Sequence, residues 1–293
     1  MIAVDWGTSN FRAFRLAPGG AIRERRSSPR GVLHVEKARF ESVLSEAVGD
    51  WIDDGETQIL LCGMIGSRQG WVEAPYLSCP VGIDDLAHAT ICVPFSKAHV
   101  RLIPGVSGLD ENGVPEVMRG EETETMGILD SSGADGLVCF PGSHCKWIYL
   151  KGAKISSFRS YVTGELFAAV RKSTILGRTV ASSDATIGEA FERGLVRSAE
   201  SGGLLHHLFG VRTLALTRGM NEEASASYLS GLLIGHEIRH AMSPGAMVRI
   251  VGVKPLCSLY ARAIEFCGGF ARVERGFAAA HGLAAIGARL KWT

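Results

Sequence analysis

The stretch DWGTSNFR, residues 5–12, joins a short apolar strand to a second strand through a turn of small polar residues. Asp5 ends the first strand, and the turn itself consists of Gly7, Thr8, Ser9 and Asn10. Backbone N–H groups and hydroxyls bind phosphate oxygens, and a neighbouring carboxylate holds Mg²⁺ through water. The turn therefore predicts a site for a phosphate and its magnesium ion, and a plain polar hairpin is the alternative.

The elements around this turn predict the start of an α/β lobe. Residues 1–7, 10–20 and 21–28 are short strand patterns joined by tight turns, which predicts a three-stranded meander. Apolar residues then recur at helical spacing over 38–54, and QILLCGMIG at 58–66 follows as a buried strand. A helix between two buried strands indicates a crossover to a parallel partner.

The same order of elements restarts in the second half of the chain. Residues 136–162 contain an apolar strand, a turn and two further strands, and this turn carries Gly142, Ser143 and His144. Helical patterns follow at 164–176, 186–200 and 224–242, and a strand, a turn and a helix follow at 247–268. The repeated order predicts two related α/β lobes, each with a phosphate-binding hairpin.

Composition narrows the class of protein. The 293 residues carry a net charge of +1, so the chain lacks the excess of basic residues that is typical of nucleic-acid binding. No apolar run approaches the roughly eighteen residues that a membrane span needs. The seven cysteines are scattered without a Cys-x-x-Cys pair, which favours reduced thiols. Because no signal-peptide pattern is present, we expect a cytoplasmic protein, and self-association is left open.

Motifs for other kinds of site are absent or incomplete. The chain has neither a P-loop nor a Gly-x-Gly-x-x-Gly turn after a strand. HEIRH, residues 236–240, matches the His-Glu-x-x-His pattern of zinc peptidases, in which both histidines share a helix face. The longer form needs Gly and His where this chain has Ser243 and Ala246, and Pro244 ends the helix. A zinc-dependent hydrolase, with Glu265 as a distant third ligand, is a remote alternative.

A series of motifs runs from the first strand to the last helix: DWGTSNFRAF (5–14), GMIGSRQGWVEAPYLSCP (63–80), VMRGEETETMG (117–127), FPGSHCKWI (140–148), VTGELF (162–167), YLSGLLIG (228–235) and HGLAAIG (281–287). Their order resembles the 2-dehydro-3-deoxygalactonokinase family, in the superfamily of actin, hexokinase and Hsp70. The resemblance implies a two-lobed, ribonuclease H-like α/β fold with duplicated mixed sheets, flanking helices and an interlobe cleft.

The resemblance also implies a division of the chain. Residues 1–133 would form the N-terminal lobe, with the first phosphate turn, the substrate loops and the catalytic base. Residues 134–293 would form the C-terminal lobe, with the second phosphate hairpin and the adenosine site. The last helix is expected to pack back on the first lobe.

The implied activity is transfer of a phosphoryl group from ATP, with Mg²⁺, to the terminal (6-)hydroxyl of 2-dehydro-3-deoxy-D-galactonate. The gluconate epimer stays open as a substrate, because one stereocentre separates the two. A non-catalytic nucleotide-binding regulator is a further remote alternative. Phosphoryl transfer depends on positioning, charge neutralisation and a base for the attacking hydroxyl.

Related sugar kinases place the base at the start of a helix after a glycine. Here that place belongs to Glu121, with Glu122 as the second choice and Arg119 beside them. Acids that merely complement the helix dipole are the alternative. In the resemblance Asp5 would face the metal, Lys146 would reach a phosphate, and Gly252 would mark the adenosine motif.

The implied substrate is a keto acid, so its pocket should contain a cation for the carboxylate and donors for the hydroxyls. Arg12 and Arg119 are the candidate cations. The loop at 66–78 supplies candidate hydrogen-bonding and aromatic contacts to the substrate: Ser67, Trp71, Glu73 and Tyr76.

Overall fold

The computed structural model describes residues 1–129, 135–180, 184–274 and 276–292. The chain divides into two compact units. The first comprises Met1–Asp135, Tyr149–Phe158 and Arg275–Thr293, and the second comprises Gly136–Ile148 and Arg159–Glu274. Residue 133, the predicted boundary between two lobes, lies outside the described residues.

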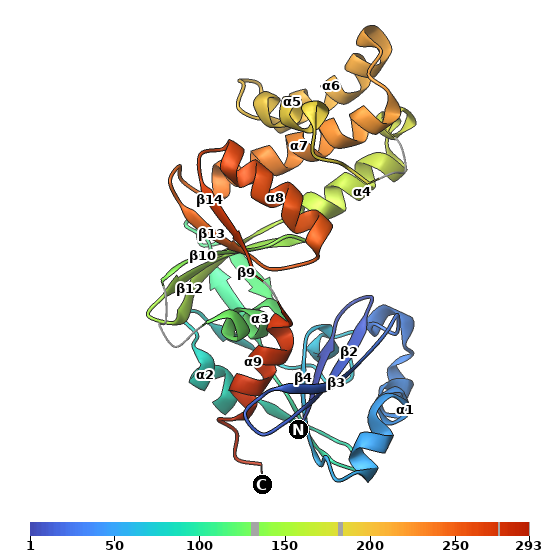
Figure 1. The fold of residues 1–293 in the computed structure, drawn as a ribbon, viewed down its shortest axis with the longest axis vertical. Helices are drawn as coiled ribbons and strands as arrows, with labels where there is room; N and C mark the ends of the chain where they lie inside the picture. Colours follow the sequence, from blue (N-terminus) through green and yellow to red (C-terminus); the bar gives the residue numbers. More distant parts are fainter. Residues whose placement is uncertain (130–134, 181–183, 275, 293) are drawn as a thin grey trace. The chain divides into compact units, whose positions relative to one another are not determined.

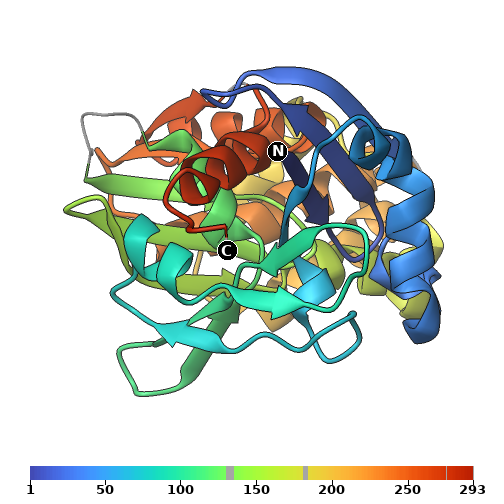
Figure 2. The same ribbon diagram turned by 90° about the horizontal axis from the view of Figure 1, so that it is seen from below.

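The main sheet of the first unit has the strand order β3-β2-β1-β4-β7-β6. Its strands are β1 (Ile2–Trp6), β2 (Phe11–Leu16), β3 (Ile22–Ser28), β4 (Gln58–Cys62), β6 (Ile91–Val93) and β7 (His99–Leu102). β1 pairs antiparallel with β2 and parallel with β4, as the meander and crossover patterns predict. The crossover helix is α1 (Phe40–Asp53), which runs beside the strands of the meander (Figure 2). Its apolar side chains pack with those of β1 and β4 in one core.

The remaining elements of the first unit follow the main sheet. A small sheet has the order β5-β8-β9, with β5 (Tyr76–Ser78), β8 (Gly105–Leu109) and β9 (Pro115–Met118). The helices are α2 (Ile83–His88), α3 (Glu121–Ile128) and α9 (Ala278–Gly287). Short 3₁₀ turns lie at Val32–His34, Lys37–Arg39 and Met64–Gly66.

Helices α3 and α9 lie side by side (Figure 1). They approach so closely that only glycine fits at their crossing. A Cβ on Gly127 would lie 1.9 Å from the carbonyl oxygen of Ala278, and one on Gly282 would lie 1.9 Å from that of Thr123. The C-terminal helix thus packs tightly on the helix that begins at Glu121.

The sheet of the second half has the order β12-β11-β10-β13-β14. Its strands are β10 (Gly136–Phe140), β11 (Cys145–Lys151), β12 (Lys154–Tyr161), β13 (Met247–Ile250) and β14 (Phe270–Val273). The helices are α4 (Thr163–Ser173), α5 (Glu189–Arg197), α6 (Gly203–Arg218), α7 (Glu222–Ala241) and α8 (Lys254–Phe266), with a 3₁₀ turn at Ile175–Thr179. Three strands followed by helices match the order predicted from the sequence.

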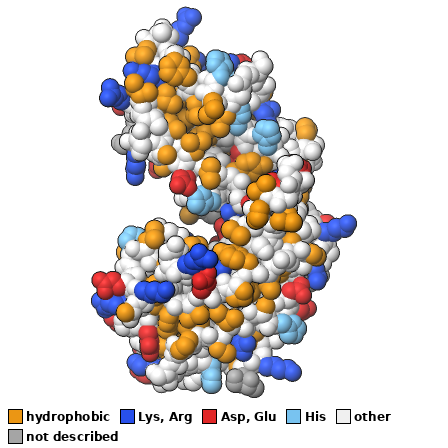
Figure 3. All heavy atoms as spheres, turned by 180° about the vertical axis from the view of Figure 1, so that it is seen from behind, with side chains coloured by type: hydrophobic (Ala, Val, Ile, Leu, Met, Phe, Trp, Pro, Cys, Tyr) orange, Lys and Arg blue, Asp and Glu red, His pale blue; other side chains and the backbone are white. Residues whose placement is uncertain are grey.

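Sequence analysis does not predict α6, because apolar residues occur on both of its faces. Leu208 and Val211 are buried, whereas Leu205, Phe209 and Leu216 are exposed. The sequence of this helix therefore lacks the single apolar stripe that is typical of a surface helix. Figure 3 shows apolar side chains gathered at the surface of the second unit's helices.

The predicted helix over 224–242 is observed as α7, and glycines explain its contact with α5. A Cβ on Gly231 would lie 2.0 Å from the carbonyl oxygen of Phe191, and one on Gly194 would lie 2.3 Å from that of Tyr228. In the described part of the chain, no helix combines the length and apolar character needed to cross a membrane. The seven cysteines are all free.

Candidate active site

Asp5 lies at the carboxyl end of β1, where the strand enters the predicted phosphate turn. Its carboxylate accepts a hydrogen bond from Nη1 of Arg12 at 3.0 Å, and its side chain is only 14% exposed. Burial raises the pKa of Asp5 more than the neighbouring Arg12 charge lowers it. Arg12 alone therefore does not fully compensate an ionised Asp5.

The phosphate turn is held in place by the loop that follows β3. N–H groups of residues 31–33 donate to the carbonyls of residues 7–9 at 3.0 to 3.2 Å. A Cβ on Gly31 would lie 2.2 Å from the carbonyl carbon of Ser9, so this close approach requires glycine. The side chains of Thr8, Ser9 and Asn10 are exposed. A fixed turn with exposed hydroxyl and amide groups suits a phosphate ligand.

Two glycines bring the start of α3 close to the carboxyl ends of β1 and β4. Asp5 pairs with Cys62, and the next residue, Gly63, has φ of 91° and lies against Trp6. Gly120 precedes α3 with φ of 115°, and a Cβ on it would lie 3.5 Å from the Cα of Gly63. Left-handed backbone of this kind favours glycine. The acids of α3 thereby come near Asp5.

Glu121 and Glu122, the two candidate bases, differ in their surroundings. Glu122 is fully buried, and its carboxylate accepts hydrogen bonds from the Gly120 N–H at 2.7 Å and the Thr123 hydroxyl at 3.0 Å. Burial, and then the Glu121 charge, raise the pKa of Glu122 to about 7. Glu121 is partly exposed, and its Oε2 accepts from the Arg119 N–H at 3.2 Å. Of the two, Glu121 is the more exposed.

Glu124 is a further acid at this site that the sequence analysis did not name. Burial raises its pKa to about 8, and the charges of Asp5 and Glu121 add to the rise. Glu124 follows Glu121 by three residues, a spacing that places both on one face of a helix. That spacing was the signal in the sequence. Asp5, Glu121 and Glu124 together form an acidic group that holds more negative charge than Arg12 neutralises.

The acids do not form a metal site of three protein ligands among the described residues, but one or two carboxylates are enough for a magnesium ion that is also bound by water and phosphates. Carboxylate oxygens are the ligands that Mg²⁺ prefers, usually one or two of them with water and substrate phosphates. The Asp5 charge raises the pKa of Glu124, an effect that a bound cation would relieve.

Arg119 is buried beside the proposed base, and its guanidinium is only partly satisfied. Nη2 donates to the carbonyl of Ala74 at 2.7 Å, and the group stacks over the ring of Tyr76 at 4.4 Å. Its Nε and Nη1 are buried and have no hydrogen-bond partner, and neither has the buried hydroxyl of Ser67. Buried donors without partners are rare in native proteins and often mark a ligand position. These groups are suited to bind a carboxylate.

Tyr76 contacts Arg119, and Ser67 follows Gly66, on which a Cβ would lie 2.9 Å from Nη1 of Arg119. The other predicted substrate contacts make different interactions. Trp71 packs against Phe95 with ring centroids 6.2 Å apart and belongs to the edge of the main core. Glu73 forms an exposed ion pair with Arg68 at 3.1 Å. Arg12 forms an ion pair with Asp5. Trp71, Glu73 and Arg12 are therefore each in contact with another residue in this structure.

The second predicted phosphate hairpin connects β10 and β11 within the second unit. Ser143 accepts a hydrogen bond from the Glu165 N–H at 3.0 Å through its carbonyl, and His144 contacts the Glu165 carboxylate. A Cβ on Gly164 would lie 2.3 Å from the Gly142 carbonyl oxygen, so the start of α4 lies directly against the hairpin. Lys146 is buried on β11, only 7% exposed.

Gly252 lies between β13 and α8, at the predicted adenosine position. Its φ is 157°, and a Cβ on it would lie 3.4 Å from Sγ of Cys257 and 3.6 Å from the carbonyl oxygen of Pro141. The turn before α8 is therefore next to the residue that precedes the phosphate hairpin. These two predicted nucleotide contacts are neighbours within one unit.

The HEIRH motif lies in α7 and does not form a zinc site among the described residues, where no group of three or more metal-binding side chains occurs. Nε2 of His236 is 3.1 Å from Nδ1 of His207. Glu237 is directed into the protein, where it accepts hydrogen bonds from Trp147 and Tyr260. His236 and Glu237 of the zinc pattern thus make side-chain contacts within the second unit.

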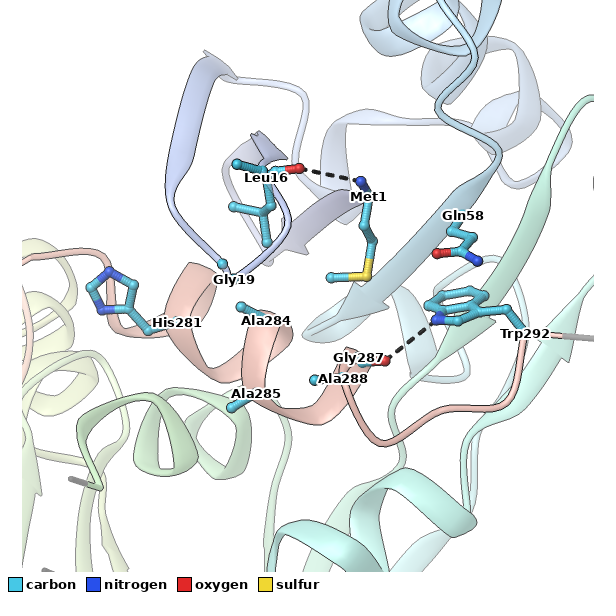
Figure 4. Close-up of a pocket in the computed structure, with 12 residues that line it drawn as sticks. Met1, Leu16, Gly19, Gln58, His281, Ala284, Ala285, Gly287, Ala288 and Trp292 are labelled. Carbon is cyan, nitrogen blue, oxygen red and sulfur yellow. Dashed lines mark hydrogen bonds between the residues drawn. The ribbon is translucent and has the colours of Figure 1, made fainter. Parts of the chain in front are cut away.

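A separate cavity of about 460 Å³ lies in the first unit, between the N-terminus, the β2–β3 turn and α9 (Figure 4). Met1, Leu16 and Trp292 contribute most of its bulky apolar lining. Trp292 donates to the Gly287 carbonyl at 3.3 Å. None of the predicted site residues lines this cavity, so it is distinct from the acidic group.

Comparisons with known proteins agree with the motifs. The family model for 2-keto-3-deoxy-galactonokinase matches residues 5–286. A probable 2-dehydro-3-deoxygalactonokinase of Rhizobium meliloti (strain 1021) is 36% identical over 273 residues, which are 91% of this chain and 89% of the relative. The 2-dehydro-3-deoxygalactonokinase of Escherichia coli (strain K12) is 32% identical over 271 residues, 91% and 90% of the two chains.

Solved structures agree on the fold. A crystal structure assigned as a 2-dehydro-3-deoxygalactonokinase from Sinorhizobium meliloti has a TM-score of 0.88 at 34% identity, covering 98% of this chain and 97% of that one. Component A of the Acidaminococcus fermentans (R)-2-hydroxyglutaryl-CoA dehydratase has a TM-score of 0.52 at 13% identity, covering 99% and 98%. The predicted α/β fold of the actin-like ATPase and sugar-kinase type is confirmed, and the hydrolase and regulator alternatives are not favoured. The chain belongs to the 2-keto-3-deoxy-galactonokinase family.

Proposed function

We propose that this chain transfers the γ-phosphoryl group of ATP to the terminal (6-)hydroxyl of 2-dehydro-3-deoxy-D-galactonate. The observation that carries the proposal is the family match over residues 5–286, which includes both RGEET and PGSHCKW. Relatives at 32% and 36% identity bear the name of this activity. ATP as the donor follows from membership of a kinase family.

Glu121 is the proposed base. It accepts the proton of the attacking hydroxyl as the new O–P bond forms and the bond from the γ-phosphorus to the leaving ADP oxygen breaks. Its partial exposure and its position at the start of α3 support this role. Glu122 has both oxygens committed to Gly120 and Thr123, so we assign it to holding the helix start in place.

Asp5, with Glu124 beside it, is proposed to hold Mg²⁺. When bound, the ion neutralises phosphate charge as the phosphoryl group transfers. The first turn, with Gly7, Thr8, Ser9 and Asn10, and the second hairpin, with Gly142, Ser143, His144 and Lys146, are proposed to bind the phosphates. Gly252 is proposed to let the adenosine approach the start of α8.

The substrate carboxylate is proposed to bind Arg119. Two donors of this guanidinium lack a partner, whereas Arg12 already pairs with Asp5. Ser67 would add a third donor, and Tyr76 would hold the guanidinium plane through its ring. A bidentate contact of this kind fixes the orientation of a sugar acid as well as its affinity.

The base assignment is tested with Glu121→Gln. Because the amide cannot accept the hydroxyl proton, kcat should fall at least about a hundredfold while MgATP binding stays within about twofold of wild type. ADP release and calorimetric nucleotide binding measure the two effects. Glu41→Gln is the matched control, since Glu41 is an exposed acid in the first turn of α1. Strong residual turnover in Glu121→Gln would move the base to Glu122 or to no single residue.

A further inference from the structure

Glu237, the central acid of HEIRH, is the most buried carboxylate of the second unit that the proposed reaction does not use. Its side chain is 3% exposed. Oε1 accepts a hydrogen bond from Nε1 of Trp147 at 2.7 Å, and Oε2 accepts one from the Tyr260 hydroxyl at 2.7 Å. The side chain of Thr163 also hydrogen-bonds this carboxylate. The side chain of Cys145 interacts with it as well, so four side chains from three elements, β11, α4 and α8, converge on one acid of α7.

Those elements surround the second phosphate hairpin. Trp147 is on β11, directly after the hairpin, and Thr163 begins α4, which lies against the Gly142 carbonyl. Tyr260 is on α8, which follows the predicted adenosine turn at Gly252. Glu237 therefore links, through side chains alone, the parts of the second unit that carry its predicted nucleotide contacts.

A series of close polar contacts extends from Glu237 into the hairpin itself. The Tyr260 oxygen lies 2.9 Å from Sγ of Cys145, and that thiol donates to the Gly142 carbonyl at 3.4 Å. Burial raises the pKa of Cys145 to about 12, and burial likewise keeps Tyr260 protonated by raising its pKa. Both groups therefore stay protonated at neutral pH. The single thiol proton serves the Gly142 carbonyl and the single hydroxyl proton serves Glu237, so Cys145 and Tyr260 are joined by a close contact of their sulfur and oxygen atoms.

Burying a carboxylate in a protein core costs free energy, because the charged group loses its hydration. Well-packed apolar side chains of similar volume are often as stabilising or more so, while a carboxylate fixes the donors around it in one arrangement. Glu237 is buried at the cost of desolvation, which raises its pKa despite the three hydrogen bonds. A need for defined geometry at the hairpin accounts for this arrangement, whereas stability alone does not.

We propose that Glu237 is a positioning residue for the nucleotide, which holds the hairpin at residues 142–146 in its phosphate-binding shape through Trp147, Tyr260 and Cys145. The inference rests on the proposed function, because it takes ATP as the ligand of that hairpin. It assigns the His-Glu-x-x-His pattern a role in nucleotide affinity instead of zinc chemistry.

The test compares Glu237→Gln with Glu237→Met. The amide can accept from Trp147 and donate to the Tyr260 oxygen, so Glu237→Gln should stay within about threefold of wild type in every kinetic constant. Glu237→Met leaves three buried donors unpaired, so the KM for ATP and the dissociation constant for ADP should rise at least about tenfold. The KM for the keto acid and kcat at saturating ATP should change less than about threefold.

The control is Leu229→Ala, a fully buried residue of α7 in the apolar cluster of the helical region. It should lower the unfolding temperature without changing the KM for ATP by more than about twofold. Equal ATP constants in wild type and Glu237→Met would overturn the inference. So would a rise in KM for ATP in Leu229→Ala that matches the one in Glu237→Met, since that would reduce the effect to stability.

If Glu237→Met does not fold, Tyr260→Phe carries the test, because it removes one donor and the link to Cys145. Its KM for ATP should rise about threefold or more, and an unchanged value would overturn the inference. Failure of the proposed function is a separate outcome: the wild-type protein would then neither bind ADP nor release it in the presence of the sugar acid.

Discussion

Arg119 combines burial and positive charge with two hydrogen-bond donors that lack a partner. An unpaired buried donor costs about 1–3 kcal/mol, so this arrangement weakens the free protein. A substrate carboxylate would satisfy both donors at once. A neutral sugar would leave them unpaired, so the site favours an acid over a neutral sugar. Arg12, in contrast, is 46% exposed and already neutralised by Asp5.

Replacement of Arg119 by Met should therefore separate stability from binding. We expect the KM for 2-dehydro-3-deoxy-D-galactonate to rise about 10- to 100-fold, since a charge-assisted pair is lost, with the KM for ATP unchanged. The unfolding temperature should change little, because removal of two unsatisfied buried donors offsets the loss of the hydrogen bond to Ala74 and of the stacking on Tyr76. Steady-state kinetics and thermal unfolding measure the two effects.

Arg68→Met is the control for Arg119→Met, because Arg68 lies on the 66–78 loop that Arg119 contacts through Ala74, and it forms an exposed ion pair with Glu73. It should leave both constants unchanged. A lower unfolding temperature in Arg119→Met, together with an unchanged KM for the keto acid, would make Arg119 a structural link between the 66–78 loop and the segment that joins β9 to α3.

At the scale of elements, the position of the acids depends on α3, and the position of α3 depends on α9. Gly127 and Gly282 let the two backbones approach within a distance that no Cβ allows. Glu121, Glu122 and Glu124 occupy the first turn of α3. A change on α9, more than 150 residues away in the sequence, is therefore expected to move the candidate base.

Gly282→Ala tests this coupling. Its Cβ would lie 1.9 Å from the carbonyl oxygen of Thr123, so α9 and α3 must separate. We expect the free energy of unfolding to fall by about 1–3 kcal/mol, as in other overpacked cores, and kcat to fall as well. Chemical denaturation and ADP release measure the two effects.

The matched control for Gly282→Ala is Gly49→Ala in α1, where a Cβ would meet nothing within 4 Å. This substitution should raise the free energy of unfolding by about 0.5–1 kcal/mol, because alanine loses less backbone freedom in a helix. A destabilised Gly282→Ala protein with normal kcat would show that α3 keeps its site geometry without α9.

At the scale of the whole molecule, the order of elements was predictable because it depends on local hydrophobic periodicity and on turn residues. The meander, α1, β4 and α7 all follow from such patterns. Helix α6 does not, because its apolar residues point both inward and outward. Of the residues predicted at the site, Asp5 follows from its place at a strand end, whereas Glu121 follows from the resemblance to sugar kinases that place the base at a helix start after a glycine.

Other parts of the candidate site depend on side-chain directions that a sequence does not contain. Trp71 and Glu73 lie on the same loop as Ser67, yet they turn to Phe95 and Arg68. Glu124 could have been predicted from its helical spacing to Glu121. The hydrogen bond between Glu237 and Trp147, which directly follows the hairpin, joins residues 90 positions apart. Only the folded chain brings such groups together.

The most direct measurement is ADP release with MgATP and 2-dehydro-3-deoxy-D-galactonate, run beside the gluconate epimer, a neutral hexose, a reaction without acceptor and a reaction with EDTA. We predict turnover that requires both magnesium and the sugar acid, with the galactonate compound preferred over its epimer and no turnover with the hexose. ADP release that is independent of any sugar acid, or absent with both epimers, would contradict the proposed phosphoryl transfer.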